Sequence, residues 1–503
     1  MNKKLMHSVA LTGLSIILCT LFTISAGATA LKGDTSGDEK LATADYMQIK
    51  AYFYNETSLT EDQLWAADVN SDGIISTYDY MTVKRSVIKE DLLPINRAQL
   101  LSYVYENTVD KSAKLAIWGG PNGDTYNDDT DLERLCQQYA DLGITHVYNE
   151  GEWGTVTLNR LMDCYQKYGI KSIIGIPNHD KEWSLRVIQG TMNHPACWGF
   201  DMKDEPAISQ AMYFTTFTAE VRAVLPEGKM VTINLLPNVA CTPDTIQNVS
   251  FDEYDSYVRL FLNGVKPDLL SFDSYPLVGN KGINSTEMVY YMKNLLEINT
   301  LCREADVEVT SIIQSSQWGD NRMPNETELR FITNLNLVSG MDGITYFLYY
   351  SHPGFTGMVD EGWNPRPIYY YAQDINTGIK NMKSVFKDYD QVGYMFTNQP
   401  YAYRNFHNKV TDTSPVVNSF GPVTSVKSSD SILTGCFTRD DGSKAIYVMN
   451  FSMTAGNPTE VKISFNAPTY YNVWTFDGLV NIQRTNSLSL NLAPGEAAFI
   501  ELK

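Results

Sequence analysis

The stretch that decides the fold reads CWGFDMKDEP and spans residues 197–206. It begins as an apolar, aromatic strand and ends in two adjacent carboxylates and a proline. Seven other strand-like runs alternate with stretches of helical periodicity. Eight strand–helix units over about 290 residues predict an α/β fold, a (β/α)8 or TIM barrel. A doubly wound sheet is the alternative, but WGGPNGD after the first strand is not a phosphate-binding loop.

The predicted strands cover residues 115–118, 144–148, 172–176, 198–202, 230–235, 269–273, 308–314 and 343–348. In such a barrel the chemistry gathers at the carboxyl ends of the strands, so residues at those ends are candidate site residues. Polar and aromatic side chains predominate there. The candidates are Trp118, Asn149, Glu150, Trp153, Asp180, Asp204, Glu205, Asn234, Asp273, Tyr275, Gln314, Trp318 and Tyr349.

Carboxylates and aromatic rings at a barrel mouth are typical of sugar-binding sites, because rings stack on the apolar faces of sugars while acids and amides bind hydroxyls. Cleaving a glycosidic bond needs two carboxyl groups, one to protonate the leaving oxygen and one to attack the sugar or activate water. For Asp204 and Glu205 there is also a structural alternative. An acid placed before Pro206 can cap the following helix.

The Asp-Glu-Pro motif resembles the end of strand four in clan A glycoside hydrolases, where Asn-Glu-Pro is common, and the resemblance covers roughly residues 97–390. It implies that Glu205 is the acid/base and that Asp204 helps to hold the 2-hydroxyl of the sugar. The clan's nucleophile is a glutamate at the end of strand seven, but that strand carries Gln314 here. The second carboxylate is therefore expected elsewhere, or the barrel is inactive. The candidates are Glu150, Glu152, Asp180 and Asp273, of which Asp273 and then Glu150 are favoured.

Two N-terminal segments match each other at an offset of 34 residues, DTSGDEKLATADYMQIKAYF from Asp34 and DVNSDGIISTYDYMTVKRSV from Asp68. Each is a loop of oxygen-bearing residues that runs into a helical pattern. The oxygens fall at loop positions 1, 3, 5, 7 and 12, the spacing of calcium loops. The predicted ligands are Asp34, Ser36, Asp38, the Lys40 carbonyl and Asp45, then Asp68, Asn70, Asp72, the Ile74 carbonyl and Asp79.

This pair of segments resembles the type I dockerin module, in which each EF-hand-like unit has aspartate at position 12. The resemblance covers residue 33 to about residue 90. It implies an all-α module that holds two Ca2+ ions and binds a cohesin domain of a scaffoldin in a cellulosome. The first loop departs from the calcium-loop pattern because Glu39 stands where the turn glycine belongs, which predicts a weaker site.

The first thirty residues have the layout of a secretory signal peptide, with Lys3 and Lys4, an apolar run and small residues before position 31. They predict an extracellular protein with no membrane attachment after cleavage; an uncleaved anchor is the alternative. The six cysteines beyond the signal are scattered, which favours buried thiols over a disulfide scaffold. The net charge of -19 makes nucleic acid an unexpected partner.

From about residue 405, short alternating strands and the hairpin signal at Asp440–Gly442 predict an antiparallel β-sandwich. The closing NLAPGEAAFIEL resembles the C-terminal β-domain of many barrel glycosidases; a carbohydrate-binding module is the alternative. The expected organisation is a signal peptide (1–30), a dockerin (31–92), a barrel (97–395) and a β-sandwich (400–503). The predicted function is a secreted, cellulosomal glycoside hydrolase acting on plant cell-wall polysaccharide; the alternative is a catalytically degenerate, carbohydrate-binding barrel.

Overall fold

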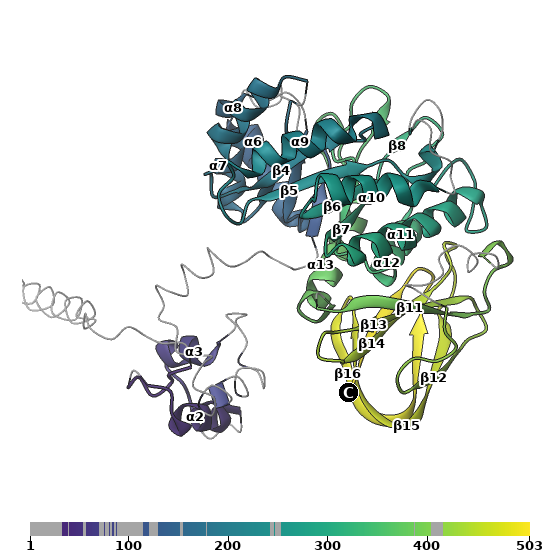
Figure 1. Cartoon of the computed structure of the whole chain (residues 1–503). Helices are drawn as coiled ribbons and strands as arrows, with labels where there is room; N and C mark the ends of the chain where they lie inside the picture. The colour runs from purple at the N-terminus through teal and green to yellow at the C-terminus, as the bar shows by residue number, and fades with distance from the viewer. Residues whose placement is uncertain are drawn as a thin grey trace, which may run out of the picture. The chain divides into compact units, whose positions relative to one another are not determined.

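The computed structural model describes residues 33–38, 40–53, 57–69, 75, 80, 83, 84, 87, 114–119, 129–150, 154–177, 179–241, 246, 253–386, 388–403 and 416–503. They belong to two compact units, Met1–Val109 and Asp110–Lys503, which are treated one at a time below (Figure 1). The predicted signal peptide lies outside the described residues. Within the described ranges, no helix is long and apolar enough to cross a membrane.

Eight parallel strands of the second unit close into a barrel in the order β1-β2-β3-β4-β5-β6-β7-β9. The ring closes because β9 pairs with both β7 and β1, which confirms the barrel and rules out an open doubly wound sheet. Each strand begins and ends within two residues of its prediction. The strands are β1 (Lys114–Ile117), β2 (His146–Asn149), β3 (Lys171–Gly175), β4 (Cys197–Asp204), β5 (Met230–Leu235), β6 (Leu269–Asp273), β7 (Glu308–Gln314) and β9 (Gly343–Phe347).

Helices surround the barrel, as Figure 1 shows for the second unit. They are α6 (Asp129–Leu142), α7 (Thr155–Lys167), α8 (Lys181–Thr191), α9 (Ala211–Arg222), α10 (Tyr254–Gly264), α11 (Thr286–Glu304), α12 (Glu326–Val338) and α13 (Pro367–Phe386), with short 3-10 turns η2 (Ile208–Gln210), η3 (Asn238–Ala240) and η5 (Tyr401–Tyr403). Their apolar faces bury on the outside of the strands. In α7, Leu158, Leu161, Met162 and Tyr165 are buried at the three-and-four spacing of one helical face.

Strand β4 runs through the core as its sequence predicts, buried from Cys197 to Met202. Its glycine has a packing role, because a Cβ at Gly199 would lie 2.2 Å from the carbonyl oxygen of Met230 on β5. No other residue fits so close to a neighbouring backbone. The opening stretch therefore packs tightly at its start and leaves its polar end for the barrel mouth.

The C-terminal region is antiparallel, as expected, but it forms one curled sheet rather than two stacked ones. The strands are β11 (Asp390–Thr397), β12 (Val423–Lys427), β13 (Ile432–Thr438), β14 (Lys444–Asn450), β15 (Thr459–Thr475), β16 (Gly478–Leu492) and β17 (Ala497–Leu502). The curl arises because β15 pairs with β12 along its first half and with β17 along its second. An irregularity in the β15–β16 pairing separates these halves.

The curled sheet packs on α12 and α13, so barrel and sheet share one core. The Tyr447 hydroxyl donates to Asn334 Oδ1 at 2.8 Å, and Asn334 Nδ2 donates to the Gly495 carbonyl at 2.8 Å. Rings meet beside this bridge, with Phe331 and Phe451 5.3 Å apart. The six cysteines are free thiols, five of them buried, which agrees with their predicted role as small apolar residues.

The described part of the first unit is helical. Helix α2 (Thr43–Phe53) follows the first predicted calcium loop, and α3 (Glu61–Ala67) begins with a capping box between Thr60 and Gln63. Their small core contains Ile49, Ala67 and Val83. Asp45, the predicted position-12 ligand, is the fully buried acid at the start of α2.

Removing residues 1–96 is expected to leave the second unit folded, because the described core of the barrel and curled sheet lies within residues 110–503. The truncated protein should melt in a cooperative transition at the temperature found for that unit in the full chain. Calorimetry of both proteins measures this. A molten or insoluble product would place the boundary elsewhere.

Candidate active site

The end of β4 turns its two carboxylates toward the barrel mouth. Asp204 is half-buried and Glu205 is exposed, after a bulge that shifts the pairing with β5 between Asp201 and Asp204. Glu205 adopts a left-handed backbone, with φ of 49°, and its N–H donates to the Asn234 carbonyl at 2.9 Å. Such a conformation is unfavourable for a residue with a side chain and persists where the surroundings hold it, often at functional sites.

Neither carboxylate caps the next helix. Ala207 occupies the N-cap position of η2 and Gln210 that of α9, and neither cap involves Asp204 or Glu205. Asp204 instead accepts a hydrogen bond from the neighbouring strand. The structural alternative raised for Asp204 and Glu205 therefore does not hold, and both side chains remain available at the mouth.

Asn234 on β5 joins the acids of β4 and β6. Its Nδ2 donates to Asp204 Oδ1 at 2.9 Å and to Asp273 Oδ1 at 3.2 Å. Its Oδ1 accepts from the Ser271 hydroxyl at 2.9 Å, which fixes the orientation of the amide. Because Ser271 and Asn234 are register partners, the β5–β6 pairing itself sets this geometry. Three residues predicted from the strand ends, Asp204, Asn234 and Asp273, thus lie together.

Glu205 and Asp273 are hydrogen-bonded to each other. Burial raises the pKa of Asp273 well above its ordinary value, and the charges of Glu205 and Asp204 raise it further. Burial also raises the pKa of Glu205, and the charge of Asp204 raises it further. The hydrogen bond from Asp273 lowers the pKa of Glu205, whose side chain reaches solvent. Asp273, only 7 % exposed, therefore holds the proton that the pair shares.

Glu150, the other predicted carboxylate, lies over β3. A Cβ at Gly175 would lie 2.4 Å from its Oε2, so the glycine makes room for the acid. Burial raises the pKa of Glu150 well above its ordinary value, and the charges of Asp201 and Asp204 raise it further.

Asp201 was not predicted as a site residue. It is 1 % exposed on β4, and burial raises its pKa to about 7.

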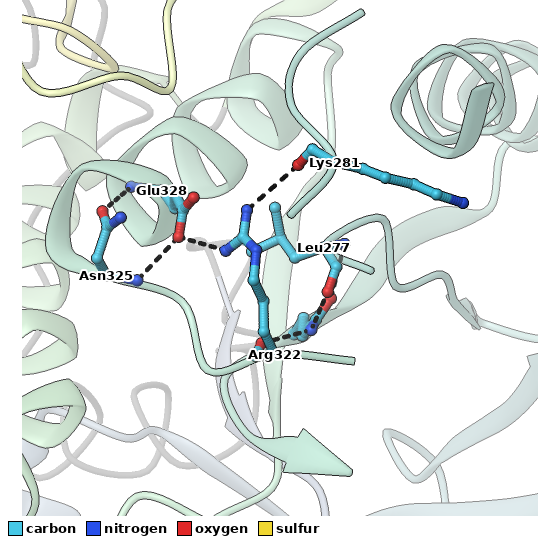
Figure 2. A network of polar contacts seen from close by, with 6 residues as sticks. Leu277, Lys281, Arg322, Asn325 and Glu328 are labelled. Atoms are coloured by element: carbon cyan, nitrogen blue, oxygen red, sulfur yellow. Dashed lines mark hydrogen bonds and ion pairs between the residues drawn. The ribbon is translucent and has the colours of Figure 1, made fainter. Parts of the chain in front are cut away.

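Gln314, at the end of β7, has a structural task. Its Oε1 accepts from the Leu277 N–H at 3.0 Å, and its Nε2 donates to the carbonyls of Leu277 (3.1 Å) and Arg322 (2.7 Å). Figure 2 shows the network around these loops, in which Arg322 pairs with Glu328 at 2.6 Å. This position needs an uncharged amide that both donates and accepts hydrogen bonds. Gln314 therefore has a structural role here and does not merely replace a lost catalytic glutamate.

An aromatic cluster lies beside Asp273. Tyr275 and Trp318 meet edge to face at 4.8 Å, and Trp318 stacks on Phe355 at 5.8 Å. Phe347 contacts both Tyr275 and Trp318. The short pair β8 (Gln317–Trp318) and β10 (Phe355–Thr356) brings Trp318 and Phe355 together. Phe347 and Phe355 were missed from the sequence because they reach this cluster through long-range pairing.

Several predicted substrate-binding residues lie elsewhere. Asn149 is buried outside the barrel, donating to Ser172 Oγ at 2.7 Å and accepting from the Tyr165 hydroxyl at 3.0 Å. The Tyr349 hydroxyl donates to Gln138, and Asp180 caps α8 by accepting from a backbone N–H. Trp118 packs inside the barrel against Tyr148. Trp153 lies outside the described residues.

Ser271→Ala is expected to disturb the acids more than the fold, because it frees the amide of Asn234 to rotate away from Asp204 and Asp273. We expect a shifted pH profile of turnover. The matched control is Ser172→Ala, which removes an equally buried serine from the amide of Asn149. Both variants should lose about 1 kcal/mol of stability. Equal pH profiles for the two variants would show that Ser271 does not position the site.

The first calcium loop is folded around its two terminal aspartates. Asp34 Oδ1 accepts from the Ser36 hydroxyl at 3.0 Å and the Gly37 N–H at 2.7 Å. Asp45 Oδ1 accepts from the Ser36 N–H at 2.9 Å. Among the described residues, no three Asp, Glu, His or Cys side chains converge as a metal cluster. The hard oxygen donors of Asp34, Ser36, Asp38, Asp45 and the Lys40 carbonyl nevertheless suit calcium.

In the second loop, Asp68 directly follows α3 as its C-cap residue. Asn70, Asp72, Ile74 and Asp79 lie outside the described residues. The ligand set of this loop therefore stays a prediction.

Residues 32–88 match the family model of the dockerin type I domain, which confirms the predicted module. No curated protein is similar to the chain. The solved structures that match include the Saccharomyces cerevisiae Gas2p mutant in its apo form, with 11% identity and a TM-score of 0.39 over 54% of this chain and 62% of that one. The same protein with laminaritetraose and laminaripentaose matches with 11% identity and a TM-score of 0.38, covering 53% of this chain and 63% of that one. The chain thus spans less than two thirds of these proteins.

Proposed function

We propose that this chain, a (β/α)8 barrel joined to a dockerin type I domain, is an extracellular glycoside hydrolase that acts on plant cell-wall polysaccharide within a cellulosome. The observation that carries the proposal is the hydrogen-bonded pair Glu205 and Asp273 at the barrel mouth. Hydrolysis of a glycosidic bond requires two carboxyl groups with one proton between them. Aromatic rings beside Asp273 add a surface on which a sugar can stack.

Glu205 is the proposed general acid and base, and Asp273 the proposed nucleophile. Glu205 reaches solvent, where the leaving oxygen of a bound polysaccharide can approach, whereas Asp273 is buried beneath it. Before reaction the proton is on Asp273, so it must cross the shared hydrogen bond to Glu205. That single transfer creates both required states, a carboxylate on Asp273 and an acid on Glu205. Asn234 holds Asp273 in place during the exchange.

The direct contact between the two carboxyl groups favours retention of anomeric configuration. An inverting enzyme separates its carboxyls by about 6.5–9.5 Å to admit water, whereas a retaining one holds them about 5–5.5 Å apart. A pair in hydrogen-bonding contact is nearer to the retaining separation than to the inverting one. Proton NMR of the first product from a neutral polysaccharide tests this, and a product of inverted configuration would refute the assignment of Asp273 as nucleophile.

A second candidate function is carbohydrate binding without cleavage, which Gln314 favours because the clan's nucleophile is absent from β7. The two candidates differ in a simple assay. Release of reducing sugar from a panel of neutral plant polysaccharides supports hydrolysis. Binding to those polysaccharides without release supports the second candidate.

Calcium is expected to hold the dockerin in its folded form and to be needed for cohesin binding. When bound, the ion neutralises carboxylates of each loop, with Asp34, Asp38 and Asp45 as ligands in the first. Chelation, or Asp45→Ala, should therefore loosen residues 33–88 and abolish capture of a type I cohesin. Capture is measured on cohesin-coated beads, with Asp62→Ala, an exposed acid on α3, as the control. Unchanged capture in chelator would contradict the calcium requirement.

A further inference from the structure

The described residues of the loops that follow the eight barrel strands carry more acids than bases. These residues are 118, 119, 150, 154, 176, 177, 179, 180, 205–207, 236–241, 246, 253, 274–285, 315–325 and 348–366. Their Lys and Arg residues are Lys281, Arg322 and Arg366. Their acids are Glu150, Asp180, Glu205, Glu253, Asp320, Asp360 and Glu361. Anything bound at the mouth therefore approaches a region in which the described acids outnumber the described bases.

The three bases of these loops already face acids. Lys281 pairs with Glu287, and Arg322 pairs with Glu328 while also donating to the Lys281 carbonyl at 3.4 Å (Figure 2). Arg366 is half-buried and lies near enough to Asp360 to help lower the pKa of that carboxyl. A carboxylate on a ligand would have to compete with these partners.

Inside the mouth, one further base faces a group of carboxyls. The positive charge of Lys203, at the end of β4, acts on Glu150, Asp201, Asp204 and Glu205. Burial raises the pKa of each of these four acids, and the charge of Asp204 raises it further for the other three. A carboxylate on a bound sugar would lose its water of hydration beside these acids. Among the described residues of the mouth it would find no unpaired cation to replace that water, so its binding is unfavourable.

We propose that the barrel mouth selects sugar units by charge, accepting neutral or amine-bearing units next to Glu205 and Asp273 and excluding uronic acids. This inference rests on the proposed glycoside hydrolase function and narrows its substrate class. The aromatic cluster of Tyr275, Trp318, Phe347 and Phe355 fits the same class, because stacking on rings needs no charge on the sugar. Uncharged backbones of cell-wall polysaccharide are the substrates it admits, and pectic acid is one it rejects.

The test uses the full chain carrying Glu205→Gln, which can bind without turning over. Calorimetric titrations compare cellohexaose, xylohexaose and mannohexaose with hexagalacturonate and with the glucosamine hexamer. We expect one or more of the neutral hexamers or the amine-bearing hexamer to bind, and hexagalacturonate to bind at least about ten-fold more weakly, since one unpaired charge costs roughly that much.

Salt gives a second, independent readout. Raising ionic strength screens repulsion, so weak binding of hexagalacturonate should strengthen with salt, whereas a site that uses a Lys or Arg would show the opposite trend. Hexagalacturonate that binds as tightly as the best neutral hexamer, and more weakly in salt, overturns the charge selection but leaves the hydrolase proposal standing. Failure of every hexamer to bind overturns both.

Discussion

Replacing Glu205 by glutamine is expected to lower turnover on a natural polysaccharide by about 10²–10⁴-fold, the usual contribution of general acid–base catalysis. Glutamine keeps the shape of the side chain but cannot give a proton to the leaving oxygen. Aryl glycosides with a good leaving group need little protonation, so their turnover should fall much less. The measurement is kcat on a polysaccharide and on an aryl glycoside, for the wild-type protein and the Glu205→Gln variant.

Stability provides the control for this variant. Glu205 is exposed and caps no helix, so its melting temperature should stay near that of the wild type. Full turnover in a folded Glu205→Gln protein would remove Glu205 from the mechanism and direct attention to Glu150 and Asp273.

Asp273→Asn is expected to abolish turnover, with a loss on the order of 10³-fold or more, because an amide cannot attack the sugar. A good leaving group should not restore activity to this variant. If an aryl glycoside with a good leaving group restores activity to Asp273→Asn and not to Glu205→Gln, then Asp273 is the general acid and Glu205 the nucleophile. Asparagine retains a donor toward Glu205 and an acceptor toward Asn234, so the local geometry should survive.

The same variant should be more stable than the wild type at neutral pH. The pKa of Asp273 is raised in the folded protein, so the folded state binds its proton more tightly than the unfolded state. Its contribution to stability is therefore present below the ordinary aspartate pKa of about 4 and is lost as the pH rises toward the folded value. Melting curves between pH 4 and pH 8 should show a downward trend that Asp273→Asn flattens; an unchanged trend would place the proton elsewhere.

The barrel could be predicted from sequence because its strands are short apolar runs separated by helices with clear apolar faces. The run from Cys197 to Met202 is an example, since every residue in it is buried and Asp201 is its one charged side chain. The two acids after it could be placed at the mouth for the same reason. The chain direction of a parallel barrel puts every strand end on one face.

The sequence predicted less accurately whether each strand side chain lies inside or outside the barrel. Successive side chains of a strand point to opposite sides, so a shift of one residue exchanges the inside and outside of the barrel. Tyr148 lies inside with Trp118, whereas its neighbour Asn149 lies outside under Tyr165. The role of Gln314 was hidden for another reason, because its side chain bonds to the loop backbone at Leu277 and Arg322, and Leu277 lies 37 residues away in sequence.

The measurement that most directly tests the central claim is the release of reducing sugar from neutral plant polysaccharides by the wild-type protein and by the double variant Glu205→Gln/Asp273→Asn. Both proteins should melt cooperatively, so that a loss of activity reports on chemistry. The account predicts release by the wild type and none by the double variant. A wild type that releases no sugar from any of the neutral polysaccharides, or a double variant that works as well as the wild type, would contradict it.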